Sequence, residues 1–315
     1  MKSRISKIFL FLSGVLLLAG CEKGENIFNM FEDVTVTLHE NSAYSVTGYK
    51  EVNDGDSIHI DFTINSANKD MYEVWLFESG LESPTLKIPI TDESKRREFS
   101  SIIKLKANTR AGKTTYRVFP VDKDLVYMGD GHKQIVIDVK PNFRFLTEKH
   151  LFLPDSQKVN KCFGSLSTGE TFSYSQGKAN EAKIDFGIDT AWVVISQTPT
   201  TVVKELKYHM FSPDAANLPL FPFYDLSGWN KRTTLFSVPI TSNAAKAFTD
   251  LKLASQIIAG AQKAKTEQKG PFTFASGSLI YFKTQEGKFG ALYIKAMANS
   301  YSLGTYVEYQ VKIPD

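Results

Sequence analysis

The stretch IHIDFTIN, residues 58–65, places an apolar side chain at every second position. Side chains alternate between the two faces of a β-strand, so this period of two predicts a strand with one buried face. The apolar face would consist of Ile58, Ile60, Phe62 and Ile64. Residues 34–39 repeat the same alternation and predict a second strand of this kind.

Further short strands are expected around these two. The segment YEVWLFE, residues 72–78, is apolar on both faces, which is typical of a central or covered strand. Asp54-Gly55 and Asp130-Gly131 indicate turns, because glycine accepts a positive φ without steric cost. The remaining strands are predicted at 88–90, 99–105, 114–121 and 134–139. About seven short strands within residues 31–140 indicate an antiparallel β-sandwich of immunoglobulin or fibronectin type.

A second β-rich domain is predicted for residues 141–315. Lys140-Pro141-Asn142 interrupts the strand pattern, and proline cannot donate to a strand ladder, so we place the domain boundary there. Strand-like segments follow at 143–152, 172–174, 183–187, 191–195, 278–284, 290–296 and 307–313. Residues 243–269 instead space their apolar side chains as a helix does. One helix, or a turn followed by a helix from Thr249, is expected within this segment.

The first twenty-one residues, MKSRISKIFLFLSGVLLLAGC, indicate where the chain works. Basic residues precede an apolar core and then small residues, which is the order of a secretory signal peptide. The apolar run is shorter than the roughly 20 residues that cross a bilayer as a helix. Its last four residues resemble the bacterial lipobox. That resemblance implies a signal peptide at 1–20, a lipid anchor on Cys21 and a tether at 21–30; an ordinary signal followed by a chance cysteine is the alternative.

The charge balance argues against a nucleic-acid partner. The chain has 37 Lys plus Arg and 34 Asp plus Glu, and three of the basic residues belong to the signal peptide, which leaves 34 of each sign. Binding of DNA or RNA requires a concentrated basic face. With Cys21 lipidated, Cys162 is the one remaining thiol, so an internal disulfide is excluded. We expect Cys162 to be a small buried residue.

No enzyme motif stands out in the sequence. The five histidines lack metal-pair spacing, and no G-x-S-x-G, P-loop or G-x-G-x-x-G motif in a suitable context is present. Glu73 with Glu78, and Asp185 with Asp189, are carboxylate pairs of the type that hydrolyses glycosides, but a solvated strand edge or loop explains each better. We predict a non-catalytic protein without a cofactor.

Calcium is a weaker candidate than local turn chemistry. Aspartates supply hard oxygen ligands, but they also form turns by bonding to the nearby backbone. The residues concerned are Asp54, Asp56, Asp122, Asp124 and Asp130. We predict no metal site.

The candidate binding residues lie in LPLFPFYDLSGWNKRT, residues 218–233. Prolines interrupt this segment, and its four aromatic residues cannot all alternate into one sheet. An exposed ring would stack on a sugar while polar neighbours bond its hydroxyls; the residues in question are Tyr224, Asp225, Trp229, Asn230 and Arg232. The alternative is a loop that covers the core with its aromatic rings as plugs. Trp75 and Trp192 lie in apolar strands and are expected in the core.

The closing pattern GSLIYFKTQEGKFGALYIKA, residues 277–296, together with the lipobox and the two β domains, resembles uncharacterised Bacteroidetes cell-envelope lipoproteins. Many of these are encoded beside glycan-uptake systems. The resemblance implies an outer-membrane lipoprotein, at the cell surface or on the periplasmic face, with a glycan-associated role.

Two functions follow as hypotheses. The first is a lipid-anchored binding protein whose ligand is a polysaccharide or other glycan. The second is a structural or adhesion lipoprotein that contacts other envelope proteins without recognising sugar. Exposure of Trp229 and Tyr224 would favour the first, whereas an apolar patch elsewhere would favour a protein partner.

Overall fold

The computed structural model describes residues 33–107, 110–218, 220–300 and 304–315. Within them the chain is mainly β, which confirms the predicted fold class. The chain divides into two compact units, the first ending at Asp138 and the second running from Val139 to Asp315, with residues Val52–Asp56 and Ala107–Gly112 grouped with the second. The predicted signal peptide, the lipidation site Cys21 and the tether at 21–30 lie outside the described residues.

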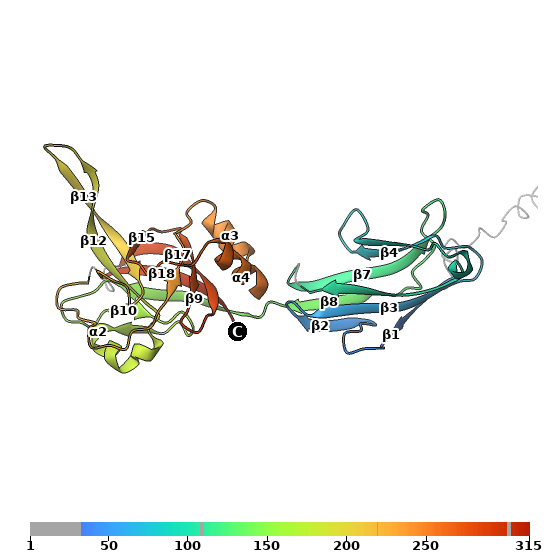
Figure 1. The fold of residues 1–315 in the computed structure, drawn as a ribbon, viewed down its shortest axis with the longest axis horizontal. Helices are drawn as coiled ribbons and strands as arrows, with labels where there is room; N and C mark the ends of the chain where they lie inside the picture. The colour runs from blue at the N-terminus through green and yellow to red at the C-terminus, as the bar shows by residue number, and fades with distance from the viewer. Residues whose placement is uncertain (1–32, 108–109, 219, 301–303) are drawn as a thin grey trace, which may run out of the picture. The chain divides into compact units, whose positions relative to one another are not determined.

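The first unit is a β-sandwich of two sheets (Figure 1). One sheet has the order β1-β3-β6, with strands β1 (Val34–His39), β3 (Ser57–Ser66) and β6 (Glu98–Lys106). The other has the order β2-β8-β7-β4-β5, with strands β2 (Tyr49–Asn53), β4 (Glu73–Glu78), β5 (Leu86–Pro89), β7 (Gly112–Val121) and β8 (Ile135–Lys140). A short 3-10 helix, η2 (Glu93–Lys95), precedes β6.

The alternation in IHIDFTIN accounts for the central position of β3. Its four apolar side chains are at most 2% exposed and face the core. Antiparallel pairing joins β3 to β1 on one side and to β6 on the other. A strand with neighbours on both edges satisfies its backbone hydrogen-bonding groups, and the buried face adds the apolar contact.

The second unit contains two five-stranded sheets. The first has the order β11-β10-β12-β13-β15, with strands β10 (Lys161–Gly164), β11 (Thr171–Ser173), β12 (Phe186–Gln197), β13 (Val202–Phe211) and β15 (Phe272–Phe274). The second has the order β14-β16-β17-β18-β9, with strands β9 (Phe143–Phe152), β14 (Leu235–Phe236), β16 (Leu279–Lys283), β17 (Phe289–Ser300) and β18 (Gly304–Pro314). Large apolar side chains from both sheets form one buried core, including Phe163, Phe186, Phe236, Phe282 and Tyr309.

The helical segment predicted at 243–269 is two helices rather than one. Helix α3 (Ala244–Asp250) ends where Leu251 adopts an extended conformation, and α4 (Ala254–Lys263) then begins. The buried ammonium of Lys312, on β18, donates hydrogen bonds of 2.7 Å to the carbonyl oxygens of Phe248 and Leu251 at this break. Apolar residues of both helices pack with Leu279, Tyr281 and Ala291 of β16 and β17. The short helices α2 (Tyr174–Gly177) and η3 (Lys178–Lys183) were not predicted.

Close packing in this core leads to a test with two glycines. A Cβ atom at Gly187, on β12, would lie 2.6 Å from the ring of Phe211 and 2.9 Å from that of Phe163. Gly187→Ala should therefore lower the free energy of unfolding by about 1–3 kcal/mol through overpacking. At Gly228 a Cβ would meet no atom within 4 Å. Gly228→Ala should change stability by less than about 0.5 kcal/mol, and equal effects in chemical denaturation would contradict this packing.

Candidate functional site

The predicted ligand-binding residue Tyr224 is part of the core. Its side chain is 6% exposed. The hydroxyl donates to the carbonyl oxygen of Asp155 at 3.1 Å, and the ring stacks on Tyr174 with 4.5 Å between centroids. The aromatic ring and the hydroxyl of Tyr224 therefore both have their contacts inside the protein.

Trp229 is half-buried and packs against the same core. Its ring centroid lies 5.2 Å from that of Phe163 and 5.7 Å from that of Tyr174. A Cβ at Gly177 would overlap the Trp229 ring, so this glycine leaves the space that the indole occupies. The loop at 218–233 thus packs three of its four aromatic rings, those of Phe221, Tyr224 and Trp229, against the core, which is the plug arrangement. The most exposed ring of the loop is Phe223, at 77%.

The polar candidates of the loop also bond within the protein. The carboxylate of Asp225 accepts hydrogen bonds of 2.8 Å from the backbone nitrogen and hydroxyl of Ser227, and these bonds lower its pKa. Asn230 donates from its backbone and side-chain nitrogens to Glu181, at 2.8 and 2.6 Å. These bonds hold the side chains of Asp225 and Asn230 in place within the protein.

Arg232 pairs with two carboxylates, one buried and one exposed. Its guanidinium donates to Asp185 at 2.9 Å and to Glu286 at 2.8 Å. Asp185 is 1% exposed, and burial raises its pKa despite the nearby guanidinium. The expectation that Asp185 and Asp189 are solvated was therefore wrong.

Asp189, near the start of β12, bonds to the loop at 218–233. The side chain is 2% exposed, and one carboxylate oxygen accepts a hydrogen bond of 2.6 Å from the backbone nitrogen of Phe221. Burial raises the pKa of Asp189 to about 6. Each buried aspartate thus has a hydrogen-bond partner within the protein.

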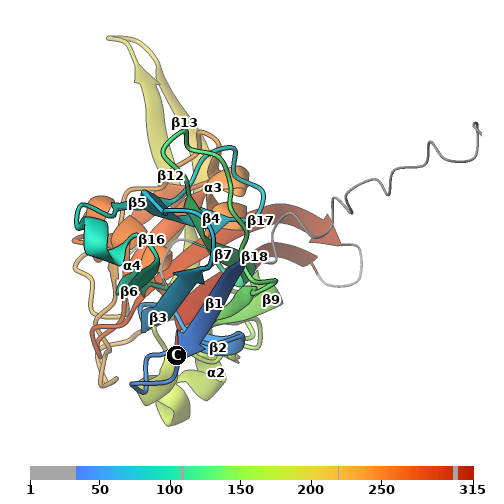
Figure 2. The same ribbon diagram turned by 90° about the vertical axis from the view of Figure 1, so that its right-hand side faces the viewer.

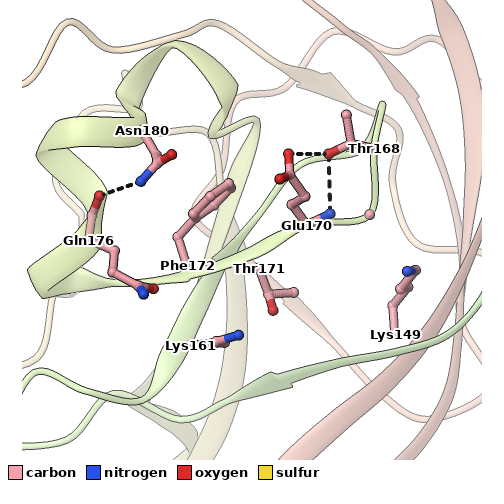
Figure 3. Close-up of a pocket in the computed structure, with 9 residues that line it drawn as sticks. Lys149, Lys161, Thr168, Glu170, Thr171, Phe172, Gln176 and Asn180 are labelled. Carbon is pink, nitrogen blue, oxygen red and sulfur yellow. Dashed lines mark hydrogen bonds between the residues drawn. The ribbon is translucent and has the colours of Figure 1, made fainter.

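A polar groove of about 430 Å³ lies beside β9, β10, β11 and α2 (Figure 3). Lys149 and Lys161 line it, and neither ammonium pairs with a carboxylate within the described part of the chain. The side-chain oxygen of Gln176 accepts from the backbone nitrogen of Ser173 at 3.2 Å, which leaves its amide nitrogen as a donor. These groups suit the hydroxyls or carboxylates of a polar ligand. Phe172, which also lines the groove, is only 7% exposed and offers little ring surface for stacking.

The most distinctive surface of the second unit is the outer half of the β12–β13 hairpin, residues 190–207, which we call the arm. Strand β10 pairs with β12 only at Phe186 and Gly187, and β15 pairs with β13 only from Tyr208 to Met210. The β12–β13 ladder continues to Gln197 and Val202. Figures 1 and 2 both show the arm projecting from the body of its unit.

Large apolar side chains are exposed along the whole arm. Trp192 is 67% exposed, which corrects the expectation that it lies in the core. The others, each 43–53% exposed, are Val194, Ile195, Val202, Val203 and Leu206. Residues 190–203 include no charged side chain. The arm is therefore an apolar surface that the described residues of the chain leave uncovered.

The sequence predicted one of the two strands of the arm. The segment at 191–195 was correctly predicted as a strand, but β13 was missed because Lys204, Glu205 and Lys207 interrupt its apolar alternation. The groove was missed as well, since its residues come from separate elements and follow no motif. Within the described ranges, no three His, Cys, Asp or Glu side chains are grouped to hold a metal ion, and no helix is long and apolar enough to cross a membrane. Cys162 is buried, as predicted.

Comparisons with known proteins do not identify a family. No family model and no curated protein matches the chain. Among solved structures, the chain is similar to a Niemann-Pick type C2 protein from Japanese carpenter ant, with 11% identity over 34% of this chain and 89% of that one, at a TM-score of 0.21. At that TM-score the likeness identifies neither the fold nor the function.

The plug arrangement predicts how substitutions in the loop act. Trp229→Ala should lower the free energy of unfolding by about 2–4 kcal/mol, somewhat less than for a fully buried indole, because the substitution leaves a cavity against Phe163 and Gly177. Phe223→Ala removes an exposed ring from the same loop and should change stability by no more than about 0.5 kcal/mol. Denaturant unfolding of both variants measures the difference. A Trp229→Ala variant as stable as Phe223→Ala would contradict the plug.

Proposed function

We propose that this chain is a lipid-anchored, non-catalytic binding protein of the cell envelope that contacts another protein through the arm. The observation that carries this proposal is the exposed apolar surface of Trp192 and its neighbours. The anchor on Cys21 and the outer-membrane location rest on the resemblance of residues 18–21 to a lipobox.

Burial of the arm against a partner would be favourable for the same reason that its exposure is unfavourable. Removing apolar surface from water contributes about 25 cal/mol per Å². Contiguous apolar patches on monomeric proteins commonly mark interaction sites. Tryptophan is also among the side chains that most often dominate binding energy at interfaces. Trp192 is therefore the expected centre of the contact.

The backbone of the arm favours a protein partner over a lipid bilayer. Beyond Gly187 on β12, and before Tyr208 on β13, no described strand pairs with the outer edges of the arm. Hydrocarbon offers no partner for such N–H and C=O groups, which makes insertion of an open sheet edge costly. A protein partner provides both apolar side chains and backbone hydrogen-bonding groups.

Site-specific photo-cross-linking in intact cells tests this function. A photoreactive phenylalanine analogue replaces Trp192, which keeps an aromatic ring at that position. The matched control carries the analogue at Val238, which is 71% exposed on the same unit but outside the arm. We expect a protein adduct from position 192 that is absent from position 238 and is lost when Val194→Lys is added. Equal adducts from both positions, or adducts with lipid alone, would contradict the proposal.

Glycan binding is a second candidate function, and the polar groove is the observation that favours it. Its unpaired donors, on Lys161 and Gln176 among others, match the hydroxyls of a polysaccharide. A glycan-array screen of the full chain should then show a ligand whose binding falls at least about tenfold in Lys161→Ala and Gln176→Ala, the loss of roughly one charged hydrogen bond. Lys246→Ala, on the exposed face of α3, is the control. Binding that is unchanged in the groove variants would exclude this site.

A further inference from the structure

We infer that the partner of the arm is a second copy of this chain, and that the two copies join by antiparallel pairing of the outer edges of β12, residues 190–197. This inference rests on the proposed function, because it names the partner of the same surface.

The two edges of the arm differ in charge. The outer edge of β13 carries Lys204, Glu205 and Lys207, and β15 occupies it from Tyr208 onward. Charged side chains on an edge strand oppose further pairing. Residues 190–197 of β12 contain no charged residue and no proline, and four of them are β-branched. The free edge of β12 is therefore the edge suited to strand addition.

The strand that fits this edge must be extended, uncharged and apolar on both faces, with a free edge of its own. Within the described ranges, β12 itself has this combination. Two copies of one strand pair antiparallel about a two-fold axis, so each copy covers the open edge of the other. Since residues 190–197 carry no charge, no register of this pairing places like charges opposite each other.

One register gives the most favourable side-chain pairs. If the two-fold axis passes through Val193, Trp192 of each copy lies opposite Val194 of the other. Aromatic and β-branched side chains are a favoured cross-strand pair, and both pairs have exposed members in the single chain. An axis through Trp192 would instead place the two indoles directly opposite each other and leave Val194 opposite Thr190. We therefore place the axis at Val193.

The size of the contact indicates a weak dimer. A stable interface of standard size buries about 800 Å² on each partner. A tryptophan buries roughly 150–250 Å², and besides Trp192 the proposed contact at residues 190–197 exposes two large apolar side chains, Val194 and Ile195. Anchoring of both copies in one membrane would raise their effective concentration and favour the pairing. Membranes that contain the full chain are thus the appropriate sample.

Cysteine cross-linking tests the register directly. Single cysteines replace residues 191–195 in turn in the full chain, and isolated membranes are treated with a mild oxidant. Val193→Cys should give the strongest disulfide-linked dimer, since residues on the axis are directly opposite each other. Leu206→Cys, on the β13 side of the arm, is the matched control and should give little dimer. The parent chain should give none, because its Cys162 is 1% exposed and, in the proposed function, its Cys21 carries the lipid.

Any other result of the cross-linking experiment would contradict the inference. A maximum at Leu206 would assign the contact to β13. No dimer from any of the five positions, while the photo-adduct at position 192 persists with the mass of another protein, would replace the second copy by a different partner and leave the proposed function intact. Loss of both signals would overturn the proposed function as well. A circular dichroism spectrum of each purified variant that matches the parent excludes misfolding as the cause.

Discussion

Hydrogen bonding between β12 and β13 continues well past the strands that flank them, and the functional account depends on this mismatch. Inside the sheet, β10 and β15 cover the outer edges of the pair. Outside it, the ladder continues, with a register shift between Val194 and Ser196, to Gln197 and Val202, and no described strand pairs with its outer edges. A two-stranded ribbon is marginal in water by itself. Its extension from a well-packed sheet exposes apolar side chains to water, and the proposed partner would cover them.

Residues in the body of the second unit contact the strands of the arm where these enter the sheet. Asp189 lies at that base and accepts a hydrogen bond from Phe221, so the aromatic loop is tied to β12. Tyr224 and Trp229 of the same loop fill the space beside Tyr174 and Phe163. The loop that suggested a sugar platform therefore stabilises the sheet from which the arm projects. Tyr224 and Trp229 thus pack with the core of the unit from which the arm projects.

The local sequence pattern was sufficient to predict several of the strands, but not to predict which other elements cover each strand. The alternation in residues 58–65 predicted both β3 and its buried face, because one covering layer lies on that face. The run at 191–195 predicted a strand equally well, yet Trp192 is exposed because no described element covers this part of the arm. Which strands lie opposite one another depends on pairings far apart in the chain. The contact at the helix break is also distant in sequence: the ammonium that donates to the carbonyl oxygen of Leu251 belongs to Lys312 on β18.

Backbone hydrogen exchange on β12 tests the central claim most directly, because the claim is that its open edge pairs with protein. The measurement compares residues 190–197 in membranes that contain the full chain with the same residues in the Val193→Lys variant, where like charges would oppose pairing. The account predicts slow exchange in the parent and fast exchange in the variant at the amides that do not bond to β13. Fast exchange at these amides in both would show that the edge stays open to water and would contradict the account.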